Sequence, residues 1–299
     1  MKKISIIKVP LWYGRGRRGV EEAPALLTAA LQESELQSCI DKTIDIYIPT
    51  LSEDASNNMN AKHLQSIVAI NRNLAQVVER ELAAHQLVLT IGGDHSIGLG
   101  SVSGSLMHDE NMGVIWYDAH GDMNTESTSP TGNVHGMPVA ALMGLCKTEL
   151  NAVPKKHIKP RNIFWIGARD LDKGEQALAE QLQLHIYSTN DIHHRGMEAV
   201  LQEIRETMEK QQIKHLHLSF DVDAFDPQLF PATDVKVPDG LWMEDFDTFV
   251  SLLPSMPELT AIDLVEYNPK MDNDQKECLN KTLYFIEQLL RVNALQSEQ

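Results

Sequence analysis

The sequence has little of what marks a secreted, zinc-ribbon or membrane protein. Only three cysteines occur among its 299 residues, at Cys39, Cys146 and Cys278, and none forms a Cys-x-x-Cys pair. Three isolated cysteines exclude a disulfide framework and favour a reducing compartment. No run of about 18 apolar residues is present, and Lys8 and Pro10 interrupt the first apolar stretch before it could form a signal peptide. We therefore predict a cytoplasmic protein that does not enter a membrane.

Basic side chains are also scarce. The chain has 26 lysines and arginines against 42 aspartates and glutamates, a formal net charge of −16. Such a chain is repelled by the phosphates of nucleic acids and by anionic membranes, so neither is an expected partner. Hydrophobic residues nevertheless make up 42% of the sequence, enough for a large core. Because no repeat, low-complexity tract or clear linker is present, we predict a single domain over 1–299.

Short apolar runs, rich in branched aliphatic and aromatic residues, recur along the chain. Most are continuous rather than alternating, which is typical of strands covered on both faces. They lie at 4–9, 44–48, 87–91, 113–118, 162–167, 184–188, 215–221 and 259–265. Helical periodicity is found at 61–84, 197–211, 243–253 and 275–292. This alternation predicts a mainly parallel sheet of about eight strands, either open and doubly wound or closed into a barrel.

Acidic residues and histidines gather directly after four of these strands. Their motifs are GGDHS at 92–96, DAHGD at 118–122, FDVDAFDP at 220–227 and DLVEYNP at 263–269. The carboxyl ends of strands are where α/β sheets build their sites. Side chains two residues apart share a face of a strand, so Asp118 can point with His120, and Asp221 with Asp223.

With His95 and Asp122 added, this group holds four carboxylates and two imidazoles. Burying so many unneutralised ions would cost several kcal/mol for each of them. Four aspartate charges match two divalent cations, which could bridge a water and lower its pKa toward neutrality. The predicted ligands are His95, Asp118, His120, Asp122, Asp221 and Asp223. A single Asp at a strand end is more often a cap or turn residue, and Asp226 before Pro227 is interpreted that way.

The motifs GGDHS, DAHGD and SFDVDAFDP resemble those of the ureohydrolase family, which includes arginases, agmatinases and formiminoglutamases. The resemblance runs from Val9 to about Asn268. It implies a three-layer α/β/α sandwich with a mainly parallel sheet, not a closed barrel. It also implies two Mn²⁺ ions per chain, with Co²⁺, Zn²⁺ or Fe²⁺ as alternatives. By this resemblance, Asp118 and Asp221 would bridge the ions, His95 and Asp122 would complete one site, and His120 and Asp223 the other.

Two further segments resemble the arginase branch of the family and imply an amino-acid substrate. The first is NTESTSPTGNVHGMP at 124–138, in which Asn124, Ser129, Thr131 and Asn133 would bind the α-carboxylate. Their hydroxyl and amide groups can donate hydrogen bonds without adding charge. The second is IGARDLDKGE at 166–175, in which Asp172 would take the α-ammonium group with support from Glu175. Asp172 could equally be a helix cap, and both roles can coexist.

The same resemblance implies three catalytic residues. His135 would be a proton shuttle, since a loop histidine near its ordinary pKa can protonate a leaving amine. Glu266 would hold the guanidinium, whose fork matches a planar carboxylate. Asp122 would take the proton of the attacking hydroxide. The implied reaction is hydrolysis of L-arginine to L-ornithine and urea by a metal-bridging hydroxide, in a homo-oligomer that is a trimer or a hexamer.

One segment departs from the family pattern, and two alternative functions stay open. After PAT, relatives continue with a Gly-Thr-Pro type segment, whereas residues 234–240 here read DVKVPDG. The first alternative is a ureohydrolase acting on agmatine or a guanidino acid. The second is a non-catalytic metal-binding or arginine-binding protein on the same scaffold. Agmatine lacks the α-carboxylate that the donors at 124–133 would bind, so they favour arginine.

Overall fold

An open sheet of eight parallel strands forms the centre of the computed structural model, which describes residues 2–49 and 58–297. Every neighbouring pair of strands in it runs parallel. In sheet order the strands are β2 (Ile40–Asp45), β1 (Ile4–Val9), β3 (Leu87–Gly92), β8 (Glu258–Val265), β7 (His215–Asp221), β4 (Gly113–Tyr117), β5 (Ile163–Ala168) and β6 (His185–Ser188). Because β2 and β6 are edge strands that do not pair with each other, the sheet is not a barrel.

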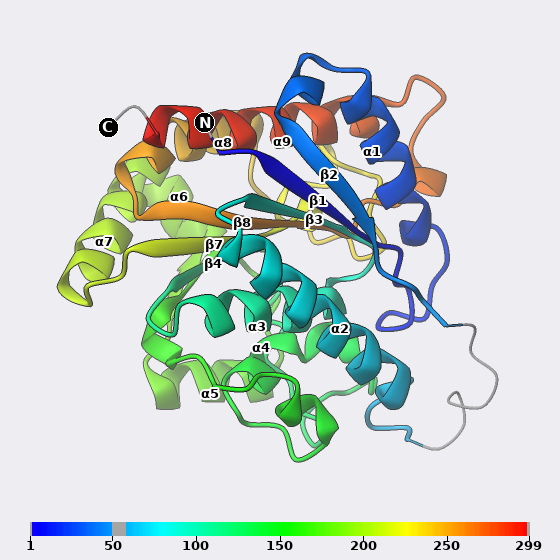
Figure 1. Cartoon of the computed structure of the whole chain (residues 1–299). Helices are drawn as coiled ribbons and strands as arrows, with labels where there is room; N and C mark the ends of the chain where they lie inside the picture. The colour runs from blue at the N-terminus through cyan, green and yellow to red at the C-terminus, as the bar shows by residue number, and fades with distance from the viewer. Residues whose placement is uncertain (1, 50–57, 298–299) are drawn as a thin grey trace.

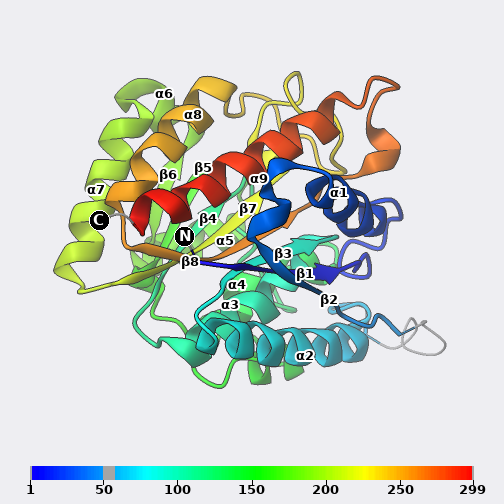
Figure 2. The same cartoon turned by 45° about the horizontal axis from the view of Figure 1, so that its top comes forward.

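Helices cover both faces of this sheet, as Figure 1 and Figure 2 show. One face carries α1 (Ala23–Gln32), α6 (Thr189–Arg195), α7 (Met197–Lys210), α8 (Met243–Leu252) and α9 (Glu277–Gln296). The other carries α2 (Leu64–Ala83), α3 (Gly98–His108), α4 (Pro138–Leu142) and α5 (Lys173–Leu182). The predicted three-layer α/β/α sandwich is confirmed.

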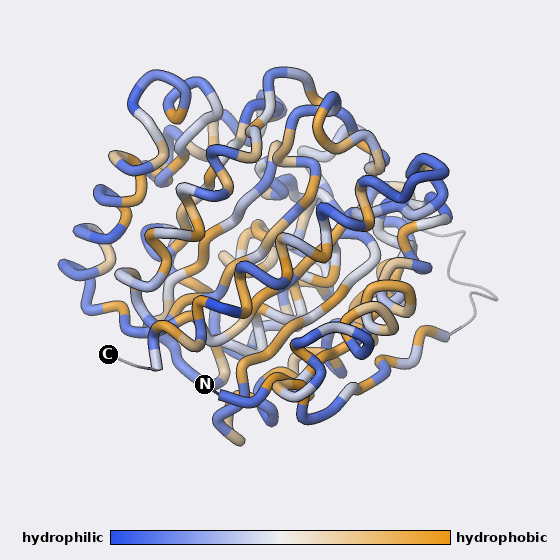
Figure 3. Tube along the Cα trace, turned by 90° about the horizontal axis from the view of Figure 1, so that it is seen from above, coloured by the Kyte–Doolittle hydropathy of each residue, from blue (hydrophilic) through white to orange (hydrophobic). Residues whose placement is uncertain are grey.

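Each face of the sheet has its own hydrophobic core. Along β4, Ile115 and Tyr117 join the core under α7 and α8, while Val114 and Trp116 join the core under α2 and α3. Burial on both faces explains why the central strands read as continuous apolar runs. Figure 3 shows these apolar strands enclosed by helices with hydrophilic outer surfaces. None of the helices in the described ranges is long and apolar enough to span a membrane.

The edge strand β2 does not lie where the apolar run in the sequence predicts it. The prediction put it at 44–48, but it begins at Ile40 and ends at Asp45. Its side chains lie on an edge and are mostly exposed or half-buried, so Asp41 and Lys42 are tolerated within it. An apolar run is therefore a poor guide to its position. The last predicted helix, 275–292, is also shifted, because α9 ends four residues later at Gln296.

Helix α3 lies in a glycine- and serine-rich segment, GLGSVSGSLMH, which shows no clear helical pattern. Its glycines allow it to pack closely on α2. A Cβ added at Gly100 or at Gly104 would lie 2.6 Å from the carbonyl oxygen of Asn71 or of Ala75. The side-chain oxygen of Asn71 also accepts a 2.7 Å hydrogen bond from the Gly100 N–H. Since α3 begins three residues after His95, this packing fixes where the first motif stands.

Candidate active site

The four strands that precede the acidic motifs are neighbours in the sheet, in the order β3, β8, β7 and β4. Their carboxyl ends therefore lie side by side, and the motifs that follow them converge. Within residues 2–49 and 58–297, ligand atoms close enough to share a metal ion occur in two groups, one of His95, Asp118 and Asp122 and one of Asp118, His120 and Asp223. Asp118 belongs to both. The chain order of the strands could not have revealed this adjacency.

The two imidazoles face the carboxylates through their Nδ1 atoms. Nδ1 of His95 lies 2.9 Å from Asp118 Oδ2, 3.0 Å from Asp122 Oδ2 and 3.1 Å from Asp221 Oδ2. Nδ1 of His120 lies 3.3 Å from Asp118 Oδ1 and 3.1 Å from Asp223 Oδ2. The structure thus brings all six predicted ligands into one cluster with two adjacent centres.

Five of these six side chains are buried and His120 is half-buried, so four carboxylates are crowded around two imidazoles. His95 Nδ1 and Asp122 Oδ2 lie 3.0 Å apart, yet neither forms a hydrogen bond of good geometry with any described residue. Burial raises the pKa of Asp221 well above its ordinary range and that of Asp122 to about 6, with Asp118 adding repulsion at both. Lone pairs that converge in this way are what divalent cations would satisfy. The residues present therefore fit a two-metal centre.

A second layer of side chains holds His95 in its orientation. The Trp116 ring stacks on the His95 ring, with centroids 4.2 Å apart, and its indole N–H donates to Asp118 Oδ2 at 3.0 Å. On the other side of the imidazole, Nε2 lies 2.9 Å from Ser219 Oγ. A partner on Nε2 fixes which nitrogen faces the carboxylates, as in many metal-binding histidines.

Asp122 and Glu266 both have left-handed backbone conformations, with φ of 51° and 65°. Such conformations are unfavourable for residues other than glycine, and they gather at functional sites. At Asp122 the backbone curls back instead of continuing as a strand. At Glu266, Oε1 accepts the His95 N–H at 2.8 Å, while Oε2 is buried with no hydrogen-bond partner among the described residues. Burial raises the pKa of Glu266 to about 7.

His135 lies beside Glu266, with 3.7 Å between His135 Nδ1 and Glu266 Oε1. Its backbone N–H donates to the carbonyl of Gly14 at 3.3 Å, which ties this loop to the first loop of the chain. Burial lowers the pKa of His135, against the opposing effect of Asp122 and Asp94. The expectation of an ordinary pKa was therefore wrong, because burial favours the neutral ring.

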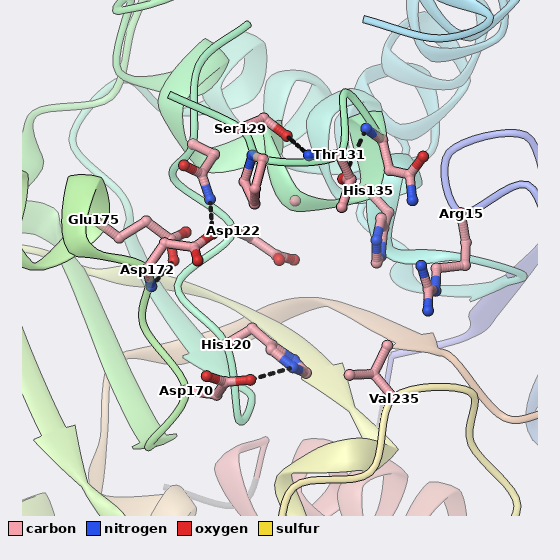
Figure 4. A pocket seen from close by; sticks show the side chains of 14 residues that line it. Arg15, His120, Asp122, Ser129, Thr131, His135, Asp170, Asp172, Glu175 and Val235 are labelled. Carbon is pink, nitrogen blue, oxygen red and sulfur yellow. Dashed lines mark hydrogen bonds and ion pairs between the residues drawn. The ribbon is translucent and has the colours of Figure 1, made fainter. Parts of the chain in front are cut away.

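An open cavity lies above the cluster, and Figure 4 shows side chains from several loops facing it. Residues of the 124–138 segment line one side. There, Ser129 Oγ accepts the Gly132 N–H at 3.0 Å, and Thr131 Oγ1 accepts the Asn133 N–H at 3.1 Å. Each hydroxyl oxygen is used as an acceptor, which leaves its O–H free to donate. The predicted carboxylate-binding residues Asn124, Ser129, Thr131 and Asn133 all line the cavity.

Acidic residues line another side of the same cavity. Asp172 is the N-cap of α5, and its Oδ2 accepts the Asn124 amide at 2.8 Å. Glu175 accepts the backbone N–H groups of Asp172 at 2.9 Å and Met123 at 3.0 Å. Burial raises the pKa of Glu175 to about 7. The capping and binding roles considered for Asp172 are thus compatible, because the cap also lines the cavity.

Several residues of the site were not predicted from the sequence, and three of them shape its wall. Arg15 and Val235 line the cavity, so the departing segment 234–240 contributes to its wall. Arg169 holds two segments together, since its Nη2 donates to the carbonyls of Asp223 at 3.0 Å and Val237 at 2.8 Å. A cationic residue at the carboxyl end of a buried strand, beside an acidic cluster, is the sequence signal that could have identified Arg169.

Comparisons with known proteins agree with this geometry. The sequence model of the Arginase family matches residues 2–291. The arginase of Entamoeba histolytica is 35% identical over 280 residues, covering 91% of this chain and 93% of that one. The arginase of Bacillus subtilis is 36% identical over 282 residues, with coverages of 92% and 93%. The crystal structure of the E. histolytica arginase with L-ornithine superposes with a TM-score of 0.89 at 33% identity, covering 97% of this chain and 99% of that one.

Proposed function

The chain belongs to the arginase family, and we propose that it hydrolyses L-arginine to L-ornithine and urea. This proposal rests on the cavity wall, which has neutral hydrogen-bond donors on one part and carboxylates on another. Neutral donors at Ser129, Thr131 and Asn133 line one part, and the carboxylates of Asp172 and Glu175 line another. An α-amino acid presents a carboxylate and an ammonium group at one end, which these two sets complement. Its side chain would then extend toward the buried cluster.

Six side chains would hold two divalent ions, which we propose to be Mn²⁺. Carboxylate oxygens with some imidazole suit this ion, and Co²⁺, Zn²⁺ and Fe²⁺ are alternatives. The residues that would hold them are His95, Asp118, His120, Asp122, Asp221 and Asp223, and Asp118 belongs to both groups of close ligand atoms. Bound ions would supply a hydroxide nucleophile at neutral pH and stabilise the negative charge that develops during attack.

The chain's own residues would then orient the substrate and move protons. Glu266 would hold the guanidinium, which supplies the partner that its buried Oε2 lacks within the described residues. Asp122, whose backbone turns its carboxylate toward the cluster, would accept the proton of the attacking oxygen. His135 would take up a proton and pass it to the leaving amine. Asp122 and His135 line the cavity, and Glu266 lies 3.7 Å from His135.

The two alternative functions predict different products from a panel of substrates. Protein loaded with Mn²⁺ should release urea from L-arginine, and far less from agmatine or 4-guanidinobutanoate. More urea from either of the other compounds would assign a different ureohydrolase activity. No urea from any of the three, with metal bound, would favour a binding protein.

We also propose that the protein acts in the cytoplasm as a trimer or hexamer. The isolated cysteines support a reducing compartment, and all three are free thiols in the structure. The oligomeric state rests on the family resemblance alone. Light scattering on the purified protein would test it, and a monomeric mass would contradict it.

A further inference from the structure

Lys62 lies two residues before α2 and contacts the substrate loop twice. Its backbone N–H donates to the carbonyl of Gly132 at 2.9 Å. Its Nζ donates to the side-chain oxygen of Asn133 at 3.0 Å. Gly132 has a φ of 70°, and a Cβ at this position would collide with the carbonyl oxygen of Met59. The turn before α2 and the substrate loop therefore touch backbone to backbone, and Lys62 links them.

The chemistry of the Lys62 contact determines which way the Asn133 amide points. An ammonium group can only donate hydrogen bonds, so the amide atom that faces it must be the oxygen. The nitrogen, Nδ2, then faces away from Lys62. Asn133 lines the cavity, and no residue in the described ranges accepts a hydrogen bond from its Nδ2. Lys62 thus leaves Asn133 with a free donor at the cavity.

Lys62 also brings a positive charge close to this donor. Within residues 2–49 and 58–297 it forms no ion pair, and its side-chain acceptor is a neutral amide, the Oδ1 of Asn133. No carboxylate of the described residues therefore pairs with its charge. An unpaired cation behind a hydrogen-bond donor strengthens that donor toward an anion. The acidic residues of the cavity, Asp172 and Glu175, instead belong to the set proposed for the ammonium group.

We propose that Lys62 is a specificity-determining positioning residue for the α-carboxylate of the substrate. It holds the Asn133 amide so that Nδ2 donates to the carboxylate, and its charge favours that anion over a ligand without one. The inference rests on the proposed function, in which Asn133 binds the carboxylate. It goes further by assigning the selection between arginine and its decarboxylated analogue to a residue outside the cavity lining.

Two product-like inhibitors separate this role from a purely structural one. L-Ornithine carries the α-carboxylate, and 1,4-diaminobutane is the same molecule without it. In Lys62→Met, the KM for arginine and the Ki for ornithine should each rise on the order of tenfold, the loss of about one charge-assisted hydrogen bond. Neither kcat nor the Ki for diaminobutane should change by more than about twofold, because the buried cluster is untouched. Lys62→Arg should restore most of the ornithine affinity, and Lys210→Met, an exposed change at the end of α7, should alter nothing.

A second mutation tests the route through Asn133. In an Asn133→Ala background, Lys62→Met should raise the Ki for ornithine much less than in the wild type, because the amide that it positions is gone. Equal effects in the two backgrounds would overturn the inference, as would equal shifts for ornithine and diaminobutane. Calorimetric binding of both ligands to the metal-loaded protein gives these ratios without turnover. The proposed function is tested by a different measurement, because it would be contradicted if the wild type released no urea. If Lys62→Met does not fold, Lys62→Gln is measured in the same way.

Discussion

Replacing Glu266 by glutamine should reduce activity and, in the metal-free protein, remove a source of instability. The change keeps the shape of the side chain but replaces one carboxylate oxygen by an amide donor, which opposes the donors of a guanidinium. Removing one partner of a buried charge pair costs about 3–5 kcal/mol. If that loss falls on the transition state, kcat/KM for arginine should drop by roughly two to four orders of magnitude.

The stability effect follows from the pKa of Glu266, which burial raises from 4.5 to about 7. At about 1.4 kcal/mol per pKa unit, ionising this buried group costs the folded protein roughly 3 kcal/mol. A raised pKa gives stability that is complete below the unfolded value and is lost as pH rises through the folded value. The penalty is therefore small near pH 5 and fully present above pH 8. Any cost of the buried amide nitrogen in the variant is the same at every pH.

The assay is urea-induced unfolding of the EDTA-treated wild type and Glu266→Gln at pH 5 and at pH 8.5. The free energy of unfolding of the variant, relative to the wild type, should increase by roughly 2–3 kcal/mol between the two pH values. A difference that does not depend on pH would refute the claim that Glu266 is an unpaired buried acid. A loss of activity below tenfold would refute its role in holding the guanidinium.

Three further changes test the metal centre. Asp223→Ala should lower bound Mn²⁺ from two ions to one per chain, as measured by elemental analysis. The control Asp226→Ala, at a turn residue, should leave two ions bound. Equal metal contents in the two variants would contradict the ligand assignment. Ser219→Ala should weaken Mn²⁺ binding by roughly 10–100-fold in calorimetry, because it frees Nε2 of His95, and an unchanged affinity would exclude this support. Mn²⁺ affinity should fall as pH drops from 8 to 5, because protons on the ligands compete with the ion: burial raises the pKa of Asp122 to about 6, and the neighbouring carboxylates raise the pKa of His95 and His120 well above their ordinary value; a constant affinity from pH 5 to 8 would contradict it.

The buried strands and the ligand motifs could be predicted because their chemistry is unusual. A strand covered on both faces has to be apolar along its length, as β3 and β7 are. Charged residues placed directly after such strands, such as Asp118 and Asp221, need a strong reason to be there. In contrast, β2 lies on an edge and α3 depends on glycines that matter only against α2. Tertiary contacts determine both, and local sequence patterns carry little of that information.

Burial and orientation within the site were equally hard to predict. The sequence identified His135 but not its burial, which shifts its pKa downward. It identified Asp122 but could not decide between an extended backbone and the left-handed turn that the structure shows. Arg169 and Lys62 act on residues far away in the chain, through carbonyl groups and an amide. Such contacts depend on which loops meet, and this was not evident from any single motif.

The most direct test of the two-metal hydrolase is a metal titration of arginine hydrolysis. The protein is stripped with chelator, its residual metal is measured, and Mn²⁺ is added back in known equivalents while urea and ornithine are quantified. We expect no urea without metal, equal amounts of urea and ornithine once metal is added, and a plateau of activity at two equivalents per chain. A plateau at one equivalent, or no urea from arginine with Mn²⁺, Co²⁺, Zn²⁺ or Fe²⁺, would contradict it.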